Sequence, residues 1–136
     1  MQYRSTRGES PAVSFSEALL AGLAPDGGLY VPTEWPQFAP GDFTAGASLA
    51  AAARTLIAPF TAGDMLAAAL DEITAEAFNF PAPLVPVGQA DYSVLELFHG
   101  PTAAFKDFGA RFLAASLARL RPAGATLFAS AVVEVP

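Results

Sequence analysis

The chain of 136 residues contains no cysteine and only one lysine and one histidine. Without cysteine it can form no disulfide, no thiolate metal site and no cysteine nucleophile. Cations are scarce as well, because seven Lys and Arg face 13 Asp and Glu, for a formal net charge of -6. Nucleic-acid binding requires clustered Lys and Arg that neutralise phosphates. We therefore expect neither a nucleic-acid partner nor a metal site.

Long apolar runs are also missing, although 53% of the residues are hydrophobic. Charged side chains interrupt the Ala-rich stretches at Arg54, Asp64, Asp71 and Glu72, whereas a membrane span needs roughly 20 apolar residues. The N-terminal residues contain no apolar segment typical of a secretory signal. These absences predict a folded cytoplasmic protein without a membrane partner, and the length suits one domain of ordinary size.

The first part of the chain carries clear helix signals. Ser14 and Glu17 form the pattern of a capping box, which predicts a helix over residues 15–23. The turn residues at 25–28 then lead to a short strand over 29–31.

Two amphipathic helices follow, over residues 49–60 and about 66–77, because apolar residues recur there at helical spacing. We expect residues 13–80 to form a helical cap in which two apolar faces pack together: Leu49, Leu56 and Phe60 on one helix, and Leu66, Leu70 and Ile73 on the other. Prolines at 81, 83 and 86 then mark a boundary and permit only a short or edge strand over 84–87.

The rest of the chain has the order strand, helix, strand. Residues 92–98 alternate as in a strand, residues 104–120 form a helix, and residues 126–129 begin another strand. This order is the minimal unit of a parallel α/β sheet. The predicted fold class is therefore α/β, with an N-terminal helical region followed by the first strand–helix–strand unit.

Lys106 is the strongest candidate for chemistry. It lies at the start of the predicted helix, where α/β folds usually bind ligands. Enclosure by Phe105 and Phe108 would remove hydration from its ammonium group and lower its pKa, as a Schiff-base lysine requires. The cofactor that most often needs such a lysine is pyridoxal 5′-phosphate. The alternative is a solvated helix residue, which is what most lysines are.

Three neighbours admit structural as well as functional interpretations. His99 can close a turn by bonding to backbone or take part in catalysis. Asp107 is favoured in a first helical turn by the helix dipole alone. Arg111 can bind an anion or pair with Asp107 four residues earlier.

The stretch LELFHGPTAAFKDFGARFL, residues 95–113, closely resembles the cofactor-lysine motif of the threonine synthase family. Upstream segments are similar to the N-terminal region of that family, in the same order: STRG at 5–8, VSFSEA at 13–18, GLAPDGGLYVP at 22–32 and FNFP at 78–81. The resemblance extends to about residue 129. It implies a fold-type II pyridoxal-phosphate enzyme that converts O-phospho-L-homoserine and water to L-threonine and phosphate.

The resemblance also implies roles for individual residues. Lys106 would be the catalytic and cofactor-binding lysine, and His99, Thr102 and Arg111 would contact substrate. It divides the chain into a family N-terminal region over 1–80, the start of the cofactor domain over 81–129 and a divergent tail over 130–136.

One departure from the family stands out. The family continues after the strand at 126–129 into a Ser/Gly/Asp/Thr-rich loop whose amides hold the cofactor phosphate, whereas residues 130–136 read SAVVEVP. We therefore expect the chain to be an N-terminal portion that is inactive alone. The alternatives are a non-catalytic module that keeps this fold and a related phosphohomoserine-processing enzyme with another product.

Overall fold

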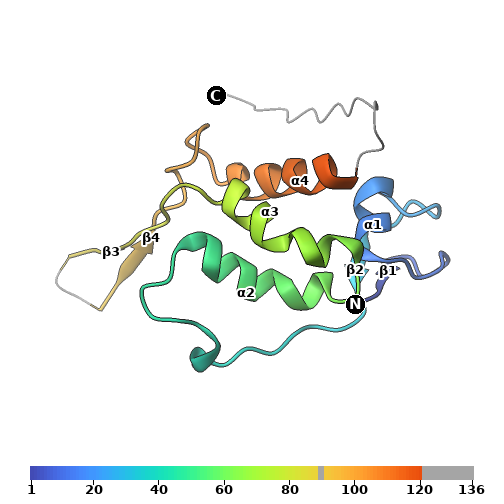
Figure 1. The fold of residues 1–136 in the computed structure, drawn as a ribbon, viewed down its shortest axis with the longest axis horizontal. Coiled ribbons are helices and arrows are strands. Elements are labelled where there is room, and N and C mark those ends of the chain that lie inside the picture. The colour runs from blue at the N-terminus through green and yellow to red at the C-terminus, as the bar shows by residue number, and fades with distance from the viewer. Residues whose placement is uncertain (89–90, 121–136) are drawn as a thin grey trace.

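The computed structural model describes residues 1–88 and 91–120 as a layer of helices with a small two-stranded sheet at each end (Figure 1). The expected strand over 126–129 and the tail over 130–136 lie outside these residues. The elements are, in chain order, β1 (Tyr3–Ser5), α1 (Phe15–Ala21), β2 (Tyr30–Pro32), the 3-10 helix η1 (Pro40–Asp42), α2 (Leu49–Thr61), the 3-10 helix η2 (Met65–Ala69), α3 (Leu70–Ala77), β3 (Leu84–Pro86), β4 (Ser93–Leu95) and α4 (Lys106–Leu120).

The capping box at the start of α1 is confirmed. The Glu17 amide donates to the Ser14 hydroxyl at 3.3 Å, and the Glu17 carboxylate accepts from the Ser14 amide at 2.8 Å. The helix ends at Ala21, two residues earlier than expected, because Gly22 turns the chain with a φ of 69°. The expected short strand is β2, shifted by one residue to Tyr30–Pro32 and paired antiparallel with β1.

Asp26 organises the turn that brings β2 back to β1. Its carboxylate accepts hydrogen bonds from the Ser5 hydroxyl at 2.7 Å, the Gly28 amide at 2.8 Å and the Glu9 amide at 3.0 Å. The bond from Ser5 is the largest influence and, with the backbone bonds, lowers the pKa of Asp26 to about 2. This turn therefore depends on an ionised carboxylate.

We predict that acid unfolds this turn by protonating Asp26. A depressed pKa contributes stability that is complete above the unfolded value of 3.8 and is lost as the pH falls toward about 2. Urea unfolding across that pH range should show a weaker pH dependence in Asp26→Asn than in the wild type. Asp71→Asn, at an exposed aspartate on α3, serves as the control and should keep the wild-type dependence. An equal dependence in Asp26→Asn would contradict the prediction.

Helices α2 and α3 occupy the regions expected from the sequence, with one local difference. The first turns of the second helix are the 3-10 helix η2, capped by Asp64, whose carboxylate accepts from the Leu66 amide at 2.9 Å. Asp64 also accepts from the amide and hydroxyl of Ser16 at the start of α1. Burial alone would raise the pKa of Asp64, but these hydrogen bonds outweigh it and lower the pKa. One carboxylate thus ties α1 to the α2–α3 corner.

The core lies between α2, α3 and α4, and only part of the expected packing is found there. Leu66, Leu70 and Ile73 are buried as predicted, with Ile73 completely inaccessible. The prediction for the α2 face is wrong for Leu56, which is 44% exposed. Leu56 lines the open groove instead, and α2 joins the cluster of Ala77 and Phe78 through Ala53, with Leu49, Ala50 and Ile57 packed beside it.

The segment before α4 is a short hairpin. β3 is the expected short strand, but the expected strand over 92–98 extends only over Ser93–Leu95 and pairs antiparallel with β3. All six hairpin residues are exposed, and the pairing continues by one backbone hydrogen bond at each end, from Val87 to Tyr92 and from Glu96 to Pro83. None of the helices in residues 1–88 and 91–120 is long and apolar enough to cross a membrane.

Candidate functional site

Lys106 is the first residue of α4, and its side chain is exposed. Phe105 is 68% exposed, and its ring lies 6.1 Å from that of the half-buried Phe108. The expected enclosure of the lysine between aromatic rings is therefore wrong for the described part of the chain. No hydrogen bond or ion pair within residues 1–88 and 91–120 engages the Lys106 amine, so within these residues the amine is accessible for reaction.

The loop that enters α4 is anchored by Asp107. The Thr102 amide donates to Asp107 Oδ2 and the Thr102 hydroxyl donates to Asp107 Oδ1, each at 2.9 Å. Asp107 is only 5% exposed, and Ala103 between the partners has a positive φ of 55°. Helix α4 begins at Lys106 instead of residue 104 because this loop folds back on its first turn. The hydroxyl of Thr102, an expected substrate contact, is directed at Asp107.

Gly100 packs directly on Asp107. A Cβ at residue 100 would lie 2.7 Å from Asp107 Cβ and would overlap the carboxylate. The close approach therefore requires glycine at this position. The sequence predicted for Asp107 only a favourable place in the helix dipole or a pair with Arg111. The signals for its contact with the loop were the turn residues at 100–102, five to seven residues upstream.

His99 pairs with a carboxylate that the sequence analysis did not select. Its Nε2 lies 2.6 Å from Glu96 Oε2. A carboxylate only accepts, so the ring nitrogen donates this hydrogen bond. The ring also lies against Phe98, with 4.7 Å between centroids. The expectation of a bond to backbone is replaced by a side-chain pair, and a catalytic role for His99 stays a prediction.

Arg111 stabilises the end of α3. Its guanidinium donates to the Ala77 carbonyl at 2.9 Å, the Glu76 carbonyl at 2.8 Å and the Asn79 side chain at 3.0 Å. A cation at these terminal carbonyls also complements the helix dipole. The pairing with Asp107 is not formed, because the guanidinium is engaged with α3. Substrate binding by Arg111 stays a prediction.

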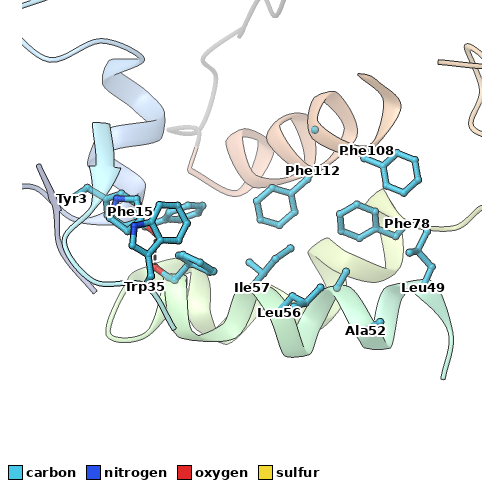
Figure 2. Close-up of a pocket in the computed structure, with 14 residues that line it drawn as sticks. Tyr3, Phe15, Trp35, Leu49, Ala52, Leu56, Ile57, Phe78, Phe108 and Phe112 are labelled. Carbon is cyan, nitrogen blue, oxygen red and sulfur yellow. Dashed lines mark hydrogen bonds between the residues drawn. The ribbon is translucent and has the colours of Figure 1, made fainter. Parts of the chain in front are cut away.

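A large apolar groove lies beside the lysine segment without including Lys106. It has a volume of about 550 Å³ and runs between α2, α4 and the β1–β2 sheet (Figure 2). Its 14 lining residues carry no charged side chain, and Phe78, Phe108 and Phe112 form one wall. Burial, with a contribution from the Asp64 charge, raises the pKa of Tyr3 to about 12. The groove thus offers apolar contact but no acid–base or cation chemistry.

Comparison with known proteins gives consistent matches. Residues 2–78 match the family model described as "Threonine synthase N terminus". The chain is 43% identical over 119 residues to the threonine synthase of Pseudomonas aeruginosa. Among solved structures, it is similar to pyridoxal-phosphate-bound threonine synthase from Brucella melitensis, with a TM-score of 0.77 and 46% identity. The threonine synthase structure from Escherichia coli gives a TM-score of 0.79 and 34% identity.

The matches differ in how much of each protein they cover. Each of the two structures matches 88% of this chain but only 28% of the solved chain. The Pseudomonas match covers 83% of this chain and 25% of the relative. The chain therefore spans about a quarter of the length of its relatives and has the α/β fold of that quarter.

Proposed function

We propose, since this chain belongs to the threonine synthase family, that it supplies the lysine-bearing N-terminal part of an enzyme that makes L-threonine and phosphate from O-phospho-L-homoserine and water. The observation that carries the proposal is Lys106, exposed at the first residue of α4 in a chain similar to a pyridoxal-phosphate-bound threonine synthase. The reaction belongs to threonine biosynthesis, which we place in the cytoplasm. The proposed partner is the small-molecule substrate, not nucleic acid or a membrane.

The described residues fit one end of pyridoxal 5′-phosphate. The group carries an aldehyde, and Lys106 is the only side-chain amine in the chain, so Lys106 would hold it covalently. The cofactor, when bound, acts as an electron sink for carbanions beside an amino-acid nitrogen. Its phosphate and ring nitrogen require further partners, which we assign to the other three quarters of the relatives' length.

The residues around Lys106 have separate tasks in this proposal. The Lys106 amine, once free, accepts and returns protons at the substrate carbons, as a positioned general base and acid does. His99, held by Glu96, would contact the anionic substrate. Thr102 contacts substrate through its exposed loop while its hydroxyl stays on Asp107. Arg111 would contact substrate through those guanidinium N–H groups that do not bind the end of α3.

A second candidate function is a non-catalytic module that keeps this fold without turnover. The chain covers only a quarter of its relatives, and its apolar groove provides surface for packing against another polypeptide. A related phosphohomoserine-processing enzyme would share the lysine segment but form another product. These alternatives differ from the proposal in whether threonine is formed.

The decisive experiment is a hybrid enzyme. Residues 1–120 of this chain replace the matching N-terminal part of the Pseudomonas aeruginosa threonine synthase. Purified hybrid should form threonine and phosphate from O-phospho-L-homoserine, whereas the 136-residue chain alone should release no phosphate above background. A folded hybrid that forms no product would contradict the proposal and favour the non-catalytic module. Phosphate release without threonine would favour the related enzyme.

A further inference from the structure

The carboxylate beside Lys106 is the most constrained polar group near the proposed lysine. Asp107 is nearly inaccessible, yet both of its oxygens are satisfied by Thr102, one through the amide and one through the hydroxyl. Hydrogen bonds to an ionised carboxylate are roughly twice as strong as neutral ones. A buried carboxylate that lost these donors would be strongly unfavourable. The loop and the first turn of α4 are therefore coupled.

This coupling opposes the local preference of the sequence. Residues 103–105 read Ala-Ala-Phe, and alanine is the best helix former, so propensity alone favours a helix that begins earlier. The structure instead holds Ala103 at a φ of 55°, a left-handed conformation that non-glycine residues rarely adopt. The two bonds from Thr102 to Asp107, together with the close packing of Gly100, offset that cost.

The helix dipole does not explain the arrangement. Asp71 occupies the first turn of α3 as Asp107 occupies that of α4, and both positions favour a carboxylate. Asp71, however, is exposed and pairs with Arg54 on α2. Of these two aspartates, only Asp107 binds the described loop that precedes its own helix. Asp71 is therefore the matched control for any effect of charge at a helix start.

We infer that Asp107 is the positioning residue for Lys106. By binding Thr102, Asp107 prevents α4 from beginning before Lys106, and so keeps this lysine at the N-terminus of the helix, accessible to a ligand. Without the two hydrogen bonds from Thr102, α4 would begin at Ala103. Lys106 would then be the fourth residue of the helix instead of the first. The inference rests on the proposed function for its catalytic meaning, because it assumes that Lys106 holds the cofactor.

The first test measures the helix start in the 136-residue chain by NMR. In Asp107→Asn, the Cα shifts of Ala103 and Ala104 should move to helical values, and exchange of the Thr102 amide should accelerate by about tenfold or more. Thr102→Val removes one bond and should give an intermediate change, while Thr102→Ser keeps the hydroxyl and should retain wild-type values. Asp71→Asn should leave both signals unchanged. Unchanged Ala103 shifts in both Asp107→Asn and Thr102→Val would overturn the inference.

The second test uses the hybrid enzyme and separates positioning from folding. Small misplacements of a reacting group cost up to about a hundredfold in rate, so Asp107→Asn and Thr102→Val should lower kcat by about tenfold to a hundredfold with KM within about twofold. Asp71→Asn, at an exposed aspartate outside the proposed site, should keep the wild-type kcat. Normal kcat in Asp107→Asn and Thr102→Val would overturn the inference while the proposed function stands. An inactive wild-type hybrid would instead remove the proposed function, and the NMR result would still decide whether Asp107 sets the helix start.

Discussion

Replacing Lys106 with alanine in the hybrid enzyme is expected to lower the rate of threonine formation by about 10²–10⁴-fold, the contribution of a positioned acid–base group. The loss should be at least this large, because the same amine also holds the cofactor in the proposed mechanism. Within the part of the hybrid that this chain supplies, no other lysine can substitute, since the chain contains only one. Rates measured with saturating substrate and added pyridoxal 5′-phosphate test this expectation.

The matched control removes a cation elsewhere. Arg54 lies on α2, is exposed and pairs with Asp71, so Arg54→Ala should keep nearly full activity. A Lys106→Ala hybrid that retained more than about a tenth of the wild-type rate would rule out the assigned role, since positioned acid–base catalysis contributes more than this.

Chemical trapping gives an independent measure of the same residue. The only other amine in the chain is the N-terminus, which donates to the Ala62 carbonyl at 2.7 Å. Within the residues of this chain, borohydride reduction in the presence of pyridoxal 5′-phosphate should therefore label the hybrid at Lys106, as peptide mass mapping would show. Label confined to the Met1 amine would contradict the assignment of Lys106.

Local signals made the helical part of the fold predictable. Ser14 and Glu17 fixed the start of α1 because both halves of the capping box act within four residues. The apolar period located α2 and α3 to within a few residues. Such features depend on neighbours in the chain, so they need no knowledge of tertiary contacts.

Features that depend on distant or competing contacts were not predictable in the same way. The exposure of Leu56 depends on an open groove whose other walls come from distant segments, including Phe112 more than 50 residues later. The start of α4 follows from Thr102 binding Asp107, which overrides the helix propensity of the two alanines between them. The exposed position of Lys106 is a consequence of that override, so the residue could be selected from the sequence but its surroundings could not.

Ile73 on α3 is buried whereas Leu56 on α2 is largely exposed, so truncating the two residues should have different effects on stability. Ile73 is fully inaccessible and belongs to the cluster with Leu66 and Ala115 that joins α3 to α4. Truncating such a residue to alanine costs about 2–5 kcal/mol, because apolar transfer energy is lost and a cavity remains. We expect Ile73→Ala to reduce the urea-unfolding free energy of the 136-residue chain by this amount. Ile73→Val, which removes one methyl group, should cost about 0.5–1.5 kcal/mol and provides a measurable variant if alanine prevents folding.

Leu56→Ala is the comparison that tests the arrangement of the core. Leu56 lines the open groove and is 44% exposed, so its truncation leaves no closed cavity and should cost below about 1 kcal/mol, closer to surface positions than to the core. A cost for Leu56→Ala equal to that for Ile73→Ala would mean that the groove is filled in solution. The expected order means that Ile73, at the α3–α4 contact, contributes more to stability than Leu56 in the groove. Because α4 begins with Lys106, that contact is also what carries the proposed cofactor lysine.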